Sequence, residues 1–135
     1  MLLAFRASSH SFKAKDFHQA CDGLDKTFVL AKNEHGKVIG AYTPLSWFGD
    51  GYKPDESYQS FLLGMNARVK MSVANPYKAI YCSNKMGPTF GGESSLFGLR
   101  TSFDFSISDN CNSNENSSFF FPKSYRFKER PVEIE

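Results

Sequence analysis

The sequence lacks the features that direct a chain into a membrane or into a disulfide-bonded fold. Its 135 residues include only three cysteines, Cys21, Cys82 and Cys111, and this odd, widely spaced set predicts free thiols in a reducing compartment. No apolar run approaches the roughly 18 residues of a spanning helix. Arg6 also follows the first apolar residues too soon for a signal peptide. We therefore expect a cytoplasmic, monomeric protein without membrane insertion.

A strong charge of one sign is also missing. The chain has 16 basic and 14 acidic residues, a formal net charge of +2, so neither nucleic acid nor a lipid surface is an obligatory partner. One basic stripe, formed by Arg126, Lys128 and Arg130, alternates with Tyr125 and Phe127. Such charges commonly protect an edge strand. Binding of an anionic protein or lipid surface through this stripe is the remaining alternative.

The spacings typical of metal sites and catalytic triads are absent as well. The sequence contains no H-x-x-x-H and no C-x-x-C motif. Its three histidines, His10, His18 and His35, lie beside or on a predicted helix and in a hairpin loop, an unfavourable placement for a catalytic base. We expect no enzymatic activity, no cofactor and no metal.

Four glycines and a proline occur within residues 84–98 (NKMGPTFGGESSLFG), where a phosphate loop or a nucleophilic serine would be sought. A phosphate loop needs a lysine and a hydroxyl after its last glycine, but Gly92 is followed by Glu93, which would repel phosphate. The run Gly92-Glu93-Ser94 begins like the nucleophile elbow G-x-S-x-G, but position 96 is leucine. We interpret four residues as structural, supplying turns or a close backbone approach: Gly87, Pro88, Gly91 and Gly92.

The free thiols allow an alternative function, a sacrificial or peroxide-consuming antioxidant activity. A cysteine with a pKa of about 8.5 is only a few per cent thiolate at neutral pH, so it reacts slowly unless its surroundings lower that pKa. Cys82 lies on an apolar strand, Cys21 on the apolar side of a helix, and Cys111 in a polar loop beside Asp109. We expect burial to raise the pKa of Cys82 and the thiols to be inert or slowly reactive.

The hydrophobic pattern predicts one short helix and several strands. The helix covers residues 11–23, with Ser11 as N-cap, Gly23 just past its end, and a buried face of Ala14, Phe17 and Cys21. Strands are predicted at 27–32 and 37–42, joined as a hairpin, and at 60–65, 78–82, 102–108 and 123–130, with a turn-rich insert at 43–57.

The hairpin strands are apolar on both faces, which places them at the centre of the fold. Strand 102–108 reads as half-buried, with Phe103, Phe105 and Ile107 on its core side. These elements predict a single domain over residues 1–135. Its class is β-dominated α+β, two packed antiparallel sheets forming a β-sandwich with flanking short helices.

Trp47 and Phe48, in the turn-rich insert, form the best candidate for an exposed anchor of a protein interface. Trp47 is the only tryptophan, and it adjoins a second large aromatic residue. The alternative is that Trp47 fills the end of the sandwich.

The order of several motifs resembles that of the TLDc domain of the eukaryotic oxidation-resistance proteins. The similarity lies in residues 3–8 (LAFRAS), the hairpin ending IGAY, residues 43–53, the run SFLL, and AIY followed by GPTFGG. Two departures stand out. The position of the family's aspartate after the glycines is Ser95, where Glu93 is a candidate substitute for the carboxylate, and the closing strand stops at residues 133–135 (EIE). From the resemblance we therefore expect either a trimmed domain or an abbreviated closing strand.

The resemblance implies a two-sheet β-sandwich and a role in protection against oxidative stress. It also implies a protein partner, the vacuolar-type proton pump, whose assembly family members are linked to regulating. No established active-site chemistry accompanies the family. The residues that we single out for partner binding are Trp47, Phe48 and Glu93.

Overall fold

The chain forms a short helix followed by many short strands. The computed structural model describes residues 3–33, 36–66, 68–94, 101–102, 104–109, 118–119, 125–126 and 132–133. Its helical elements are α1 (Ala14–Cys21) and the 3₁₀ turn η1 (Pro76–Lys78). Its strands are β1 (Thr27–Lys32), β2 (Val38–Thr43), β3 (Gly51–Lys53), β4 (Phe61–Gly64), β5 (Val69–Val73), β6 (Ile80–Cys82), β7 (Met86–Phe90), β8 (Glu93–Ser94), β9 (Thr101–Ser102), β10 (Phe105–Ser108), β11 (Ser118–Phe119), β12 (Tyr125–Arg126) and β13 (Val132–Glu133).

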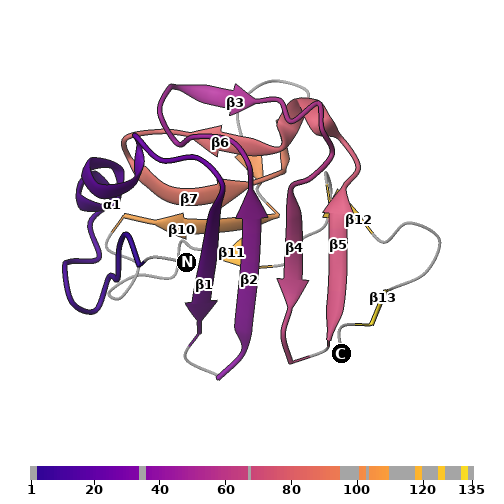
Figure 1. Cartoon of the computed structure of the whole chain (residues 1–135), viewed down its shortest axis with the longest axis horizontal. Coiled ribbons are helices and arrows are strands. Elements are labelled where there is room, and N and C mark those ends of the chain that lie inside the picture. The colour runs from indigo at the N-terminus through magenta and orange to yellow at the C-terminus, as the bar shows by residue number, and fades with distance from the viewer. Residues whose placement is uncertain are drawn as a thin grey trace.

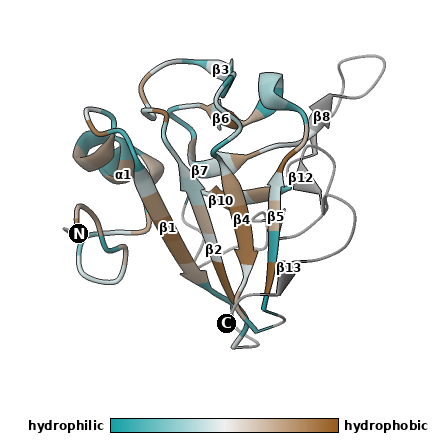
Figure 2. Cartoon of the chain, turned by 45° about the vertical axis from the view of Figure 1, so that its right-hand side comes forward, coloured by the Kyte–Doolittle hydropathy of each residue, from teal (hydrophilic) through white to brown (hydrophobic). Residues whose placement is uncertain are grey.

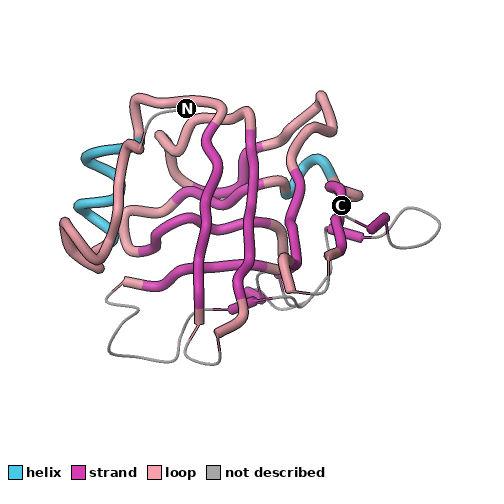
Figure 3. The backbone as a smooth tube through the Cα atoms, turned by 60° about the horizontal axis from the view of Figure 1, so that its bottom comes forward, coloured by secondary structure: helices cyan, strands magenta, loops and turns pink. Residues whose placement is uncertain are grey.

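Two antiparallel sheets account for most of these strands. The first has the order β1-β2-β4-β5-β12, with β13 also paired to β5, and the second has the order β11-β10-β7-β6-β3. Strands β8 and β9 form a separate two-stranded ribbon. The strands of the first sheet cross those of the second at a steep angle (Figures 1 and 3). The predicted class, a β-dominated α+β fold with two packed sheets, is confirmed.

The core lies between the two sheets and under α1. One buried cluster draws residues from every layer, which is why the sheets pack as a unit. Its members are Phe17, Cys21, Ile39, Ala41, Trp47, Leu62, Met71, Val73, Ala79, Ile80, Cys82, Phe90 and Phe105.

The predicted hairpin is present, but its first strand does not lie at the centre of the fold. Strands β1 and β2 pair from Thr27 opposite Thr43 to Lys32 opposite Val38. Strand β2 lies between β1 and β4, whereas β1 ends the strand order of the described part of the sheet. Alternate side chains of β1 are exposed, among them the apolar Phe28 and Leu30.

Helix α1 begins later than predicted, and Ser11 is not its N-cap. The N-cap position is Lys13, which makes no side-chain capping bond, and the Ser11 hydroxyl instead hydrogen-bonds the Asp16 carboxylate. The N–H of Ala14 donates to Asp109 Oδ1 at 2.7 Å, a partner 95 residues away. The predicted apolar face is confirmed, with Ala14, Phe17 and Cys21 buried.

The strands predicted at 60–65 and 78–82 are confirmed as β4 and β6, each somewhat shorter, with η1 preceding β6. Strand β5 was not predicted. Residues Tyr125 and Arg126 of the predicted strand 123–130 form β12, and its other residues lie outside the described part of the chain.

Strand β10 is not half-buried. Phe105 is fully buried, but so are its neighbours Asp104 and Ser106, at 0% and 1% exposed. Phe105 on one face and Ser106 and Ser108 on the other are all buried, so both faces of the strand are covered and the serines do not face solvent. Phe103 lies outside the described residues.

Candidate functional site

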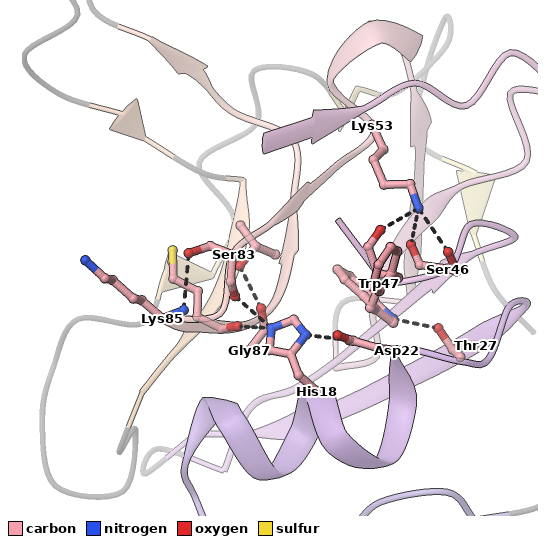
Figure 4. Close-up of polar contacts among 12 residues, drawn as sticks. His18, Asp22, Thr27, Ser46, Trp47, Lys53, Ser83, Lys85 and Gly87 are labelled. Atoms are coloured by element: carbon pink, nitrogen blue, oxygen red, sulfur yellow. Dashed lines mark hydrogen bonds and ion pairs between the residues drawn. The ribbon is translucent and has the colours of Figure 1, made fainter. Parts of the chain in front are cut away.

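The Trp47 side chain lies in the core rather than on the surface. It is 1% exposed, and its ring makes edge contacts with Phe17 of α1 and Phe90 of β7, at centroid distances of 5.7 and 5.4 Å. The indole N–H donates to Thr27 Oγ1 at 3.0 Å (Figure 4). An exposed anchor at position 47 is therefore wrong, and Trp47 acts as the internal attachment point of its loop.

The neighbouring Phe48 is 73% exposed, as an anchor for a partner must be. Its backbone is held by Lys53, whose ammonium donates to the Ser46 carbonyl at 2.7 Å, the Ser46 hydroxyl at 3.0 Å and the Phe48 carbonyl at 3.1 Å. Gly49 follows with a φ of +130°, a conformation that side-chain-bearing residues rarely adopt. We call this arrangement, residues 46–53, the Phe48 loop.

Lys53 thus closes the Phe48 loop from the far side of the turn, while Trp47 fixes it from within the core (Figure 4). A loop fixed at both points presents its exposed side chain with little conformational freedom left to lose. Sequence reasoning missed Lys53, because a lysine that folds back onto carbonyls five and seven residues away has no local signature.

The imidazole of His18 joins α1 to the turn between β6 and β7. Its Nε2 lies 2.7 Å from the carbonyl oxygens of Ser83 and Met86, and its Nδ1 lies 2.5 Å from Asp22 Oδ1 (Figure 4). Both ring nitrogens are engaged and the side chain is 10% exposed, so His18 acts structurally.

Asp55 is a second residue that sequence reasoning missed. Its buried carboxylate accepts hydrogen bonds from the backbone N–H groups of Ser57, Gln59 and Ser60 and from the hydroxyls of Ser57 and Ser60. Burial by itself raises the pKa of Asp55, but the bonds from Ser57 and Ser60 outweigh it and the net pKa is lowered. The signal was an aspartate two residues before a serine, typical of an Asx turn.

The glycine-rich run is only partly a turn. Gly87 and Pro88 lie inside β7, so their assignment to a turn is wrong. A β-carbon on Gly87 would lie 3.1 Å from the Ile107 carbonyl oxygen, so this glycine permits a close backbone approach. The register between β7 and β10 shifts beside Pro88, at the kind of bulge where a strand tolerates a residue without an N–H.

Gly91 and Gly92 do supply turn geometry, with φ of +67° and +112°. Glu93 follows them in β8, opposite Ser102 of β9. Its role in partner binding stays a prediction.

Two of the three cysteines are buried thiols. Cys21 is 5% and Cys82 1% exposed. Burial raises the pKa of Cys21, with Asp22 adding to the effect, and burial raises that of Cys82 to about 11, although nearby Lys53 opposes the rise. The predicted rise for Cys82 is confirmed. Cys111 lies outside the described residues.

The basic stripe is described only at Arg126, which pairs with Ser72 of β5; Lys128 and Arg130 lie outside the described part.

Within the residues that the structure describes, no group of three or more His, Cys, Asp or Glu side chains could hold a metal ion. No helix among them is long and apolar enough to cross a membrane.

The fold and these contacts define a two-sheet β domain in which His18, Lys53 and Asp55 hold loops and elements in place. A family model for the TLDc domain matches residues 1–134, and the chain belongs to the TLDc family. No curated protein and no solved structure matches the chain.

Proposed function

We propose that the chain is a non-catalytic protein-interaction domain that binds its partner through the Phe48 loop. The observation that carries the proposal is that Phe48, 73% exposed, lies in a loop that Lys53 holds by hydrogen bonds to two backbone carbonyls, of Ser46 and Phe48, and to the Ser46 hydroxyl. Aromatic side chains are enriched among the residues that dominate binding energy in protein interfaces. A large apolar ring held out by a fixed loop has the properties of such an anchor.

The TLDc resemblance points to subunits of the vacuolar-type proton pump as the partner, and to protection against oxidative stress as the cellular role. Binding to the pump would require a preformed surface rather than a reactive group. Support for a surface role comes from His18, Lys53 and Asp55, each of which is committed to holding backbone or neighbouring side chains.

The thiol-based antioxidant activity is less well supported. Cys21 and Cys82 are buried and their pKa values are raised, so both are kept as thiols and away from solvent. A peroxide-consuming role would then rest on Cys111 alone. Replacing all three cysteines by serine and measuring peroxide consumption and protection of cells from peroxide separates the two functions.

The matched pair for the test of the proposed function is Phe48→Ala and Tyr77→Ala. Both side chains are aromatic and 73% exposed, but only Phe48 belongs to the Phe48 loop. The measurement is retention of purified pump subunits by immobilised domain. We expect Phe48→Ala to weaken retention with the melting temperature nearly unchanged, and Tyr77→Ala to behave as wild type. Equal retention by wild type and Phe48→Ala contradicts the proposal.

A further inference from the structure

The first sheet has an apolar face directed away from the core. Because successive side chains of a strand point to opposite sides, residues paired across β1, β2, β4 and β5 line up in rows on that face. One row is Phe28, Tyr42, Phe61 and Ser72, and the next is Leu30, Gly40, Leu63 and Lys70. We call these eight residues, with Lys32 and Val38 of the adjoining pair, the outer face.

The outer face is more apolar than a solvent-facing sheet surface normally is. Antiparallel sheets with one solvated face usually alternate between apolar core residues and polar outer residues. On β1 the core side holds Val29 and Ala31, yet the outer side holds Phe28, 43% exposed, and Leu30, 62% exposed. Figure 2 shows stretches of β1 and β4 as hydrophobic. Larger exposed apolar patches are typical of interaction sites.

The side chains of the outer face are already ordered against one another. The rings of Tyr42 and Phe61 stack at a centroid distance of 5.3 Å. The Phe28 ring lies over Gly40, 2.7 Å from where a β-carbon would be, so it covers the backbone at the one position without a side chain. Binding of a partner at the outer face would therefore cost little side-chain conformational entropy.

The charges of the outer face have one sign. Lys70 holds its ammonium 4.4 Å from the centroid of the Phe61 ring, and Lys32 is exposed at the end of β1. None of the ten outer-face positions carries a carboxylate. A partner that covers the apolar rows therefore gains by bringing acidic side chains to these lysines and loses by bringing basic ones.

We propose that the outer face docks an acidic amphipathic helix of a protein partner. The apolar side of the helix would cover Phe28, Leu30 and Leu63, and aspartate or glutamate residues at its margins would meet Lys32 and Lys70. A helix is the element that commonly covers one face of a sheet. Four strands spaced about 4.8 Å apart span about 14 Å, enough for a helix about 10 Å across. The inference rests on the proposed role as an interaction domain, but not on the Phe48 loop.

The test uses two synthetic helical peptides with the same leucines at i, i+3, i+4 and i+7. One carries glutamates beside the leucines and the other carries lysines. Binding is measured by fluorescence anisotropy, and the contact surface is mapped by backbone amide shifts in NMR spectra. We expect the glutamate peptide to bind more tightly and to shift amides of β1, β2 and β4.

Two pairs of variants sharpen the test. Leu30→Thr keeps strand propensity but removes apolar surface. We expect it to weaken the affinity for the glutamate peptide by at least about fivefold. Leu3→Thr, at an apolar residue that is 71% exposed outside the outer face, serves as its control and leaves affinity unchanged. Lys70→Glu leaves one charge of each sign on the outer face, so it should remove the preference for the glutamate peptide, whereas Lys85→Glu, at an exposed lysine of the turn before β7, should not.

Several outcomes overturn the proposal. These are equal binding of both peptides, no loss with Leu30→Thr, or amide shifts confined to the Phe48 loop. Self-association that Leu30→Thr abolishes assigns the outer face to a second copy of this chain, and Leu30-dependent binding to anionic phospholipid vesicles assigns it to a lipid surface. If Leu30→Thr lowers the melting temperature, its loss of binding could come from unfolding, and the effect of Lys70→Glu on peptide preference then tests the proposal. Phe48→Ala leaves peptide binding intact, so failure here is distinct from failure of the Phe48 loop.

Discussion

Replacing Asp55 by asparagine removes the charge from a carboxylate that organises the connection between β3 and β4. Oδ2 accepts from the N–H groups of Gln59 and Ser60 and from the Ser60 hydroxyl, and Oδ1 accepts from the N–H and hydroxyl of Ser57. An asparagine offers one acceptor oxygen, so its amide NH₂ must face at least one backbone N–H. The Ser60 hydroxyl also contacts Thr43 Oγ1, which extends the disturbance to β2.

The expected loss is about 2–3 kcal/mol in the free energy of unfolding at pH 7. Hydrogen bonds to a charged group contribute about 1.5–3 kcal/mol, and a buried donor left unpaired costs about 1–3 kcal/mol. Unfolding entropy of about 2.1 cal/mol/K per residue converts this loss, for 135 residues, into a fall of about 7–11 °C in melting temperature. Thermal melts followed by circular dichroism measure it directly.

The pH dependence gives a second, independent readout. The pKa of folded Asp55 is lowered, so the stabilisation from its ionised form is fully present above the unfolded-chain value of about 3.9. It is lost as the pH falls through the lowered folded pKa. The difference in free energy of unfolding between wild type and Asp55→Asn should therefore shrink as the pH falls below about 4. Urea unfolding of both proteins at a series of pH values measures this difference. A melting temperature within 2 °C of wild type at pH 7, or a stability difference that does not change in acid, refutes the reasoning.

Three further predictions address the core, the Phe48 loop and the thiols. Trp47→Ala should cost about 3–5 kcal/mol in the free energy of unfolding, because the indole is buried against two aromatic rings; an unchanged urea midpoint contradicts this. Lys53→Met keeps the aliphatic stem but frees the loop, so it should lower stability by about 1.5–3 kcal/mol and weaken retention of pump subunits although Phe48 is intact. Wild-type retention by Lys53→Met would show that binding does not require the hydrogen bonds of Lys53 to the loop. Cys82, with its pKa raised to about 11, should react with a disulfide reagent at pH 7.5 far more slowly in folded Cys21→Ser, Cys111→Ser protein than in urea. Equal rates would place the thiol at the surface.

The sequence predicted those features that depend on local pattern. The apolar spacing of Ala14, Phe17 and Cys21 is sufficient to define the buried face of α1, because a helix repeats every 3.6 residues. Short apolar runs bounded by turn residues likewise identified β1, β2, β4 and β6, and the ordered motifs identified the family. Candidate site residues could be named only by type, as an aromatic pair in a polar loop.

Tertiary structure decided what those residues do. Whether Trp47 or Phe48 is exposed depends on Phe17, Phe90 and Lys53, which lie on other parts of the chain. The first N–H of α1, that of Ala14, donates a hydrogen bond to Asp109, whereas the local sequence pattern had favoured Ser11 as the N-cap.

The sequence alone therefore determined the fold class, the family and the absence of familiar catalytic spacings. The burial of each strand face, and with it the exposed apolar surface of β1, was decided only when the sheets paired. Alternation along a strand specifies which residues share a face. It does not specify whether another layer covers that face, because the covering layer comes from distant parts of the chain.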